Sequence, residues 1–238
     1  MRNFILLMKL PTVVLLFFLG TTVVQAQKSE LEKKLNELGI TSGLAFNDLS
    51  GNNSAFSCKA TMTEITSDKT TVRKASFDPR KEEGSHWTLL SVDGRTPSKK
   101  EFKHFNKEYN TSNDNLKAEP DKNSWTIVSE DEHLLVIGLK YNEADLPHKY
   151  KFLAECNAEI YVDKEAKRLY KVKFYNTTPL KIKIFNVIKL DMTVELMPAA
   201  DGSTTLTKDQ TIVMDVKMLG QMVEITEETA YYDYKKAE

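Results

Sequence analysis

Hydrophobic and polar residues alternate with a period of two over most of the chain. From Phe56 to Met62 every second residue is apolar, a pattern typical of a strand with one face in water. The same alternation predicts further strands near residues 69–78, 86–92, 132–140, 150–163, 167–176, 180–197, 204–218 and 221–235. Turn residues, among them the hairpin signal Asp201-Gly202, separate these strands, so consecutive strands are expected to be antiparallel neighbours.

A helix is predicted before the first strand. Ser29 and Glu32 have the spacing of a capping box, in which the serine hydroxyl accepts from the amide three residues further on. Leucines follow at helical spacing from Leu31 to Leu38, and Gly39 is expected to end the helix. The pattern therefore indicates a short amphipathic helix with one apolar stripe.

A second helix is predicted after residue 95, with Thr96 as its cap and Pro97 at its first position. Its aromatic residues recur at i, i+3 and i+7 and form one stripe. This stripe is a candidate lid across the open mouth of a curved sheet, and an ordinary helix packed on a sheet with no ligand beneath it fits the pattern equally well. The lid candidates are Phe102, Phe105 and Tyr109.

The length of the predicted strands indicates the architecture. Long antiparallel strands coil and tend to close on themselves, which protects their edges. We therefore expect a mainly antiparallel β fold of the α+β class, with a strongly curved sheet or incomplete β-barrel and a few covering helices. The polar segment 111–124 is too short to link two autonomous domains, so residues 27–238 are predicted to form a single β-rich domain.

The inward faces of the predicted strands indicate an apolar interior. Small residues at the centre of the 150–163 strand leave room, and methionine recurs on the later strands. Because its thioether side chain is flexible, methionine suits an apolar site for ligands of varied shape, although it also fills closed cores. The candidate ligand-binding residues of this apolar cavity are Phe152, Ile160, Phe174, Met192, Met214 and Met218.

The N-terminus has the pattern of a secretory signal peptide. Arg2 and Lys9 precede an apolar run, and Val24 and Ala26 provide small residues at the −3 and −1 positions of a cleavage site. A retained membrane anchor is the alternative, but the run is shorter than the about 20 residues that a spanning helix needs. We therefore predict a signal peptide over residues 1–26, no transmembrane segment after its cleavage, and secretion of the mature chain.

Two cysteines, Cys58 and Cys156, lie on apolar faces of predicted strands. An oxidising compartment permits a disulfide between them, which would constrain the unfolded chain. Two buried thiols that never meet are the alternative. Spacing alone does not decide between these interpretations, so the sequence leaves the disulfide open.

Composition and motif spacing argue against several classes of function. With 33 basic and 34 acidic residues, the chain has no strong positive field, so no nucleic-acid partner is expected. The four histidines lack the spacing of metal ligands, and no Gly-x-Ser-x-Gly elbow occurs. We therefore predict that the protein is not an enzyme and has no catalytic residue, metal site or cofactor. A carboxylate site assembled from different strands is left open, and so is a weak Ca²⁺ site at Glu130-Asp131-Glu132, although this acidic run is expected to be a solvated strand entry.

One motif resembles a known superfamily. The stretch Trp-x-Leu-Leu-Ser-Val-Asp-Gly-Arg-x-Pro-Ser over residues 87–98 precedes paired long strands with the pattern Ala-Glu-x-Tyr-Val-Asp-Lys-Glu-Ala-Lys-Arg-Leu over residues 158–169. Across most of residues 55–235 the chain resembles uncharacterised secreted bacterial proteins related to the lipoprotein-localisation (LolA/LolB-like) superfamily. The resemblance implies an unclosed antiparallel barrel that is covered by helices and shelters lipid acyl chains in the periplasm. No position here matches the functional arginine of the carriers, so no such residue is carried over.

Two functions follow from pattern and resemblance together. The first is non-catalytic binding or carriage of a lipid, a lipoprotein acyl chain or another hydrophobic ligand in the periplasm, by a monomer whose partner is that ligand or a lipid-modified protein. The alternative is a protein-interaction or scaffold module of the cell envelope with a solidly packed barrel. In that case exposed Tyr231, Tyr232 and Tyr234 are expected to meet a protein partner.

Overall fold

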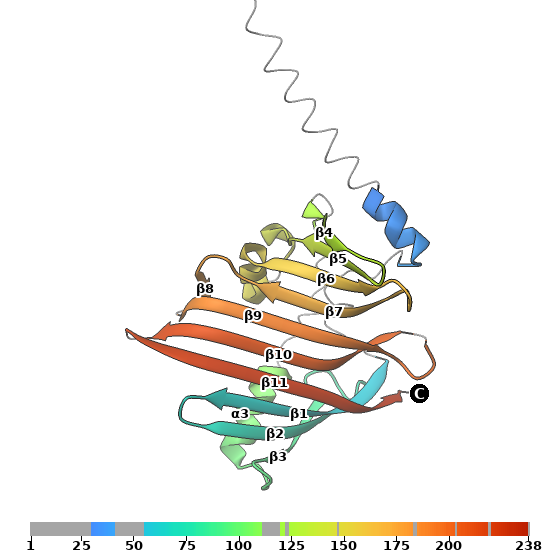
Figure 1. The fold of residues 1–238 in the computed structure, drawn as a ribbon. Helices are drawn as coiled ribbons and strands as arrows, with labels where there is room; N and C mark the ends of the chain where they lie inside the picture. Colours follow the sequence, from blue (N-terminus) through green and yellow to red (C-terminus); the bar gives the residue numbers. More distant parts are fainter. Residues whose placement is uncertain are drawn as a thin grey trace, which may run out of the picture.

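The computed structural model contains one antiparallel sheet of eleven strands, with few helices (Figure 1). The structure describes residues 30–40, 55–110, 120–121, 124–146, 148–182, 185–202, 204–218 and 220–237. The predicted signal peptide over residues 1–26 and the predicted cap Ser29 lie outside the described residues. The strands are β1 (Phe56–Thr66), β2 (Thr70–Phe77), β3 (Trp87–Val92), β4 (Thr126–Glu130), β5 (Leu134–Leu139), β6 (Asn157–Asp163), β7 (Arg168–Tyr175), β8 (Leu180–Ile182), β9 (Phe185–Pro198), β10 (Thr205–Met218) and β11 (Gln221–Lys236).

The strand order brings the first and the last strand together. It runs β3-β2-β1-β11-β10-β9-β7-β6-β5-β4, with β8 paired to β9, so the N-terminal hairpins continue the sheet from the C-terminal strand. Within the described residues no pairing joins the outer strands β3 and β4, and the sheet is therefore unclosed. This confirms the predicted fold class of an incomplete antiparallel barrel.

The strand predicted over residues 150–163 is wrong in its first half. A 3-10 helix, η3 (His148–Glu155), occupies that half, and β6 begins only at Asn157. The neighbouring strands explain the difference, because β5 ends at Leu139 opposite Ala158 and the register of β7 with β6 ends at Asn157. Residues before this point have no strand to pair with, so their backbone groups are satisfied within a helix.

Two other strands differ from the prediction. The strand predicted over residues 180–197 is two strands, β8 and β9, which pair with each other from Leu180 opposite Val187 to Ile182 opposite Phe185. The edge strand β4 was not predicted. All its residues are exposed, so it has no alternation between buried and exposed positions that a sequence pattern could reveal.

The largest group of buried side chains lies on β5, β6, β7 and β9. A helix over residues 30–37, as predicted, covers it with Leu31 and Leu35, and η3 adds Leu153. Lys34 of this helix forms an ion pair with Glu130 at the end of β4. The Glu130 carboxylate forms a second ion pair with Lys164, at 3.0 Å. Helical segments therefore cover this half of the sheet.

A second group of buried side chains lies at the other end of the sheet. There α3 (Lys99–Tyr109) packs on β1, β2 and β3, behind these strands in Figure 1. Tyr231 packs against this group, and the Tyr234 hydroxyl donates to the carbonyl oxygen of Thr207 at 2.7 Å. The expectation that Tyr231 and Tyr234 are exposed is therefore wrong, since of the three tyrosines only Tyr232 is exposed.

In the part of the chain that the structure describes, no helix combines the length and apolar character needed to cross a bilayer.

Candidate functional site

The start of α3 is fixed by a network around one carboxylate. Ser98 is the cap, and its backbone N–H and hydroxyl donate to Glu101 at 2.8 and 2.7 Å, while its oxygen accepts from the Glu101 amide. The Arg95 guanidinium donates two further hydrogen bonds to Glu101, at 2.7 and 2.9 Å. The predicted cap Thr96 is therefore wrong by two residues, because the reciprocal Ser98–Glu101 capping box starts the helix after Pro97.

The aromatic stripe of α3 divides into a buried part and an exposed part. Phe105 is 2% exposed and stacks on Tyr109 with ring centroids 4.5 Å apart. At the end of the helix, the Asn110 amide donates to the backbone carbonyl of Trp87 and accepts from its N–H, each at 2.9 Å. The C-terminal half of α3 is thus held on the sheet, whereas Phe102 in the N-terminal half is 41% exposed.

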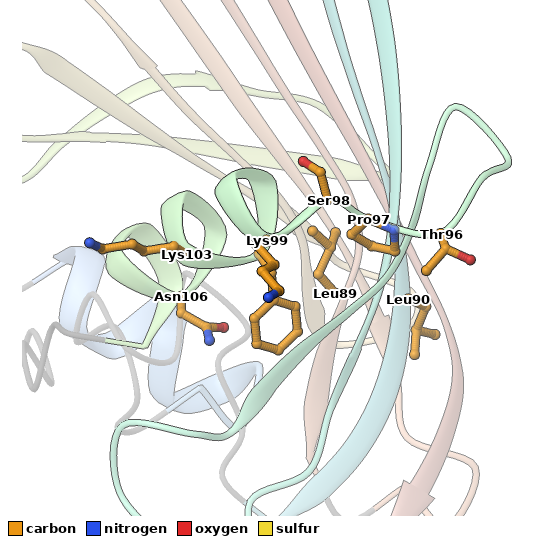
Figure 2. A pocket seen from close by; sticks show the side chains of 9 residues that line it. Leu89, Leu90, Thr96, Pro97, Ser98, Lys99, Lys103 and Asn106 are labelled. Atoms are coloured by element: carbon orange, nitrogen blue, oxygen red, sulfur yellow. The ribbon is translucent and has the colours of Figure 1, made fainter.

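A groove of about 670 Å³ lies between the exposed half of α3 and strand β3 (Figure 2). We call it the α3–β3 groove, and it is lined by Leu89, Leu90, Thr96, Pro97, Ser98, Lys99, Phe102, Lys103 and Asn106. Leu90 from the strand is 48% exposed, so both Leu90 and Phe102 offer large apolar surfaces that the protein itself leaves in contact with water. The volume lies within the range of small-molecule sites, and exposed apolar surface of this kind marks binding sites.

The geometry of β3 explains why both Leu89 and Leu90 reach the groove. In a regular strand, adjacent side chains point to opposite faces. Here the pairing with β2 shifts register between Lys74 opposite Ser91 and Ala75 opposite Leu89, so Leu90 falls at a bulge. A bulge re-aims side chains, and this one adds Leu90 to the groove wall. Sequence reasoning missed Leu90 because register is not visible in the alternation of a single strand. It also missed Lys103, although the i, i+4 spacing from Lys99 in the predicted helix was a signal that could have indicated it.

The rim of the groove carries positive charge. The Arg95 guanidinium, together with Ser98, holds the pKa of the Glu101 carboxyl far below its usual range, so Glu101 stays ionised and engaged. Among the described residues, no carboxylate forms an ion pair with Lys99 or Lys103. In Figure 2 the Lys99 and Lys103 side chains leave the helix in different directions, and that of Lys103 extends along the helix. The groove therefore combines apolar walls with two lysines whose charge is not neutralised.

Three of the predicted cavity residues lie together in the largest buried group. Ile160 and Phe174 are fully buried, and Met192, directly opposite Phe174 on β9, packs half-buried against them. Their neighbours fill the space around them, and the Phe174 ring stacks on Tyr141 with centroids 6.2 Å apart. None of the three lines the α3–β3 groove.

The other predicted cavity residues lie further along the same covered side. Phe152 of η3 packs against both the largest group and a neighbouring group around Cys156, in which Met214 is half-buried. The Met218 side chain lies outside the described residues. Ligand binding by these six residues stays a prediction. Of the three lid candidates, only Phe102 lines the groove.

Both cysteines are free and buried, so the disulfide that the sequence left open is not formed in the structure. Burial raises the pKa of the Cys58 thiol to about 11 and that of the Cys156 thiol to about 12. Thiols with such values stay protonated near neutral pH and are poor nucleophiles and metal ligands. Within the described residues, no group of three or more His, Cys, Asp or Glu side chains is placed to hold a metal ion.

Comparison with known proteins gives structural similarities only. No family model matches the chain, and no curated protein matches it. The chain is similar to the solved structure of a LolA superfamily protein from Nitrosomonas europaea at 12% identity, over 83% of this chain and 95% of that one, with a TM-score of 0.33. A DUF1329 family protein from Desulfovibrio piger matches at 10% identity over 90% of this chain and 92% of that one, with a TM-score of 0.36. The superfamily that the sequence resembles is thus among the matched structures. At such low TM-scores and identities, these similarities say nothing about a ligand.

Proposed function

We propose that the protein binds a hydrophobic ligand of the lipid type without catalysis, in the α3–β3 groove. The observation that carries this proposal is the pair of large apolar side chains, Leu90 and Phe102, that are exposed and line a groove of about 670 Å³. Burying this surface under a ligand removes apolar area from water, which is favourable by about 25 cal/mol per Å². The proposal includes carriage by a monomer in the bacterial periplasm, and the predicted signal peptide supports its secretion.

Binding of a neutral fluorescent apolar probe, such as Nile red, tests this function. We expect the purified protein to bind the probe, and Phe102→Ala and Leu90→Ala to weaken binding by about fivefold each, because each removes roughly 1 kcal/mol of apolar contact. Val128→Ala is the matched control, since Val128 is 54% exposed on the distant edge strand β4. Affinity that is unchanged in both groove variants would contradict the groove as the site.

The residues predicted to line a cavity provide an alternative site on the covered face of the sheet. Native mass spectrometry of protein purified from its own envelope, followed by lipid extraction, gives both the oligomeric state and any bound lipid. Loss of bound lipid in Met192→Trp and Met214→Trp, with folding intact, would assign binding to that face. Loss in Phe102→Ala, with binding retained in the tryptophan variants, assigns it to the groove.

A second candidate function is an interaction or scaffold module of the cell envelope. It is favoured by the complete burial of Ile160 and Phe174, which leaves no open space around these two positions. The same experiments separate the two functions, because a scaffold module is expected to keep a clean apo mass after incubation with fatty acids and phospholipids. It is also expected to show no probe binding that depends on Phe102.

A further inference from the structure

We propose that the α3–β3 groove, if it binds a hydrophobic ligand as proposed above, selects a single-chain lipid with an anionic carboxylate head, held by Lys99 and Lys103. The two lysines are spaced i, i+4 on α3, with Phe102 between them, and all three side chains line the groove. Residues with this spacing are neighbours on one helix face. The cationic groups and the apolar wall therefore belong to one continuous surface.

The charge balance of α3 indicates the sign of the head group. Lys99 and Lys103 have no carboxylate partner among the described residues, and Glu101, the acidic residue nearest to them in the helix, is bound by Arg95 and Ser98. The other acidic residue of the helix, Glu108, lies within 3.7 Å of His104. No acidic side chain of the helix therefore neutralises the rim, and an anionic ligand gains an attraction that a neutral ligand does not.

The position of the lysines also fits a lipid head at the solvent edge. The Ser98–Glu101 capping box already engages two of the backbone amides at the helix start, those of Ser98 and Glu101, so fewer N–H donors are left there for an anion. Lysine side chains can lie along apolar surface while the ammonium group stays in water. A carboxylate at the rim can therefore accept charge-assisted hydrogen bonds from Lys99 and Lys103 while its acyl chain covers Leu90 and Phe102.

Isothermal titration at pH 8 with three single-chain probes below their micelle concentrations tests the head-group preference. The probes are palmitate, neutral hexadecanol and cationic hexadecyltrimethylammonium. We expect palmitate to bind at least about tenfold more tightly than hexadecanol, and hexadecyltrimethylammonium to bind more weakly than both. The preference for palmitate is expected to shrink as salt increases, because the rim is exposed to solvent.

Two double variants with the same change in net charge assign the effect to particular lysines. Lys99→Gln/Lys103→Gln is expected to weaken palmitate binding by about tenfold and to leave hexadecanol binding unchanged. Lys100→Gln/Lys107→Gln removes two lysines of α3 that do not line the groove, and it is expected to leave both affinities unchanged. Circular dichroism checks that both variants fold like the wild-type protein.

The possible outcomes separate this inference from the proposed function. Three results would each overturn the preference for an anionic head group and leave the apolar groove as a binding site. They are equal binding of palmitate and hexadecanol, tighter binding of the cationic probe, and equal loss of palmitate binding in the two double variants. If none of the three probes binds the wild-type protein, the proposed function itself fails, and the inference fails with it. Acetate serves as a head-group control, and binding of acetate as tight as that of palmitate would show that the acyl chain contributes nothing.

Discussion

Replacing Phe105 by alanine tests whether one aromatic side chain holds α3 on the sheet. Phe105 is 2% exposed, and it packs in a group that includes Ala60 and Ala75, both fully buried. On its other side it stacks on Tyr109, with ring planes inclined by 25°. The ring therefore lies between the helix and the two neighbouring strands β1 and β2.

The structure supports a full core-type loss in the free energy of unfolding for this variant. Phenylalanine to alanine changes in cores cost about 3–5 kcal/mol, and the cost rises with the cavity that remains. The two alanines beneath the ring have no rotatable side chain that could fill the space. The hydrogen bonds between Asn110 and the Trp87 backbone also keep the helix end in place, which limits collapse. We expect Phe105→Ala to lower the free energy of unfolding by about 4 kcal/mol.

Urea unfolding followed by tryptophan fluorescence measures this loss of unfolding free energy. The Trp87 ring reports on the region, because its centroid lies 6.1 Å from that of Tyr109. Phe102→Ala is the matched control from the same helix and is expected to change the free energy of unfolding by less than about 0.5 kcal/mol, since Phe102 is exposed. If the two variants differ by less than about 1 kcal/mol, the reasoning that Phe105 anchors α3 is refuted.

Three further predictions concern stability and reactivity. Glu227 is an exposed residue opposite Glu64 across β11 and β1, where partial desolvation and the nearby Glu108 and Glu64 carboxylates raise the pKa of its carboxyl. The protonated form is therefore favoured in the folded state, and this contribution to stability is lost as pH rises through the raised pKa. Glu227→Gln is therefore expected to be more stable than wild type at pH 7 by less than about 1 kcal/mol in thermal unfolding, and a gain that persists below about pH 4 would contradict this. Cys58 and Cys156 are expected to resist a thiol reagent at neutral pH in the native protein and to react in urea, so a thiol titrated without denaturant would contradict their burial. Ser98→Ala is expected to cost about 1 kcal/mol in urea unfolding, whereas Ser98→Thr retains the hydroxyl that accepts from the Glu101 amide and donates to the Glu101 carboxylate, and equal stability of the two variants would argue against the capping box.

The alternation of the sequence predicts the long strands because each has one face packed and one face in water. The last two predicted strands, over 204–218 and 221–235, differ from β10 and β11 by one residue at most at either end. The same reasoning fails for residues 150–156, where apolar alternation continues beyond the last available strand partner at Asn157. Alternation reports which faces are apolar, but a strand also needs a neighbour, and the neighbour is set by the fold of the whole sheet.

The candidate groove was less accessible to sequence reasoning than the sheet. Its helix wall was predicted in part, since the sequence singled out Phe102 and placed a helix after residue 95. Its strand wall depends on a bulge at Leu90, and the partner register that creates this bulge has no local signature. The true helix start did have a signal, because Ser98 and Glu101 have capping-box spacing, but the equally plausible cap Thr96 came earlier in the chain.

The two halves of the sheet differ in what a ligand must displace, and this difference favours the groove. A ligand that contacts Ile160 and Phe174 must first separate them from their neighbours, and each such side chain loses about 1.5–3 kcal/mol when it leaves an apolar environment. Leu90 and Phe102 are already exposed, so a ligand that covers them displaces only water. For a ligand that makes the same apolar contact at either place, binding in the groove is therefore tighter. The difference in binding free energy equals the cost of opening the covered face. Binding at the covered face requires either a ligand that repays this cost or a separate event that moves the helix over residues 30–37.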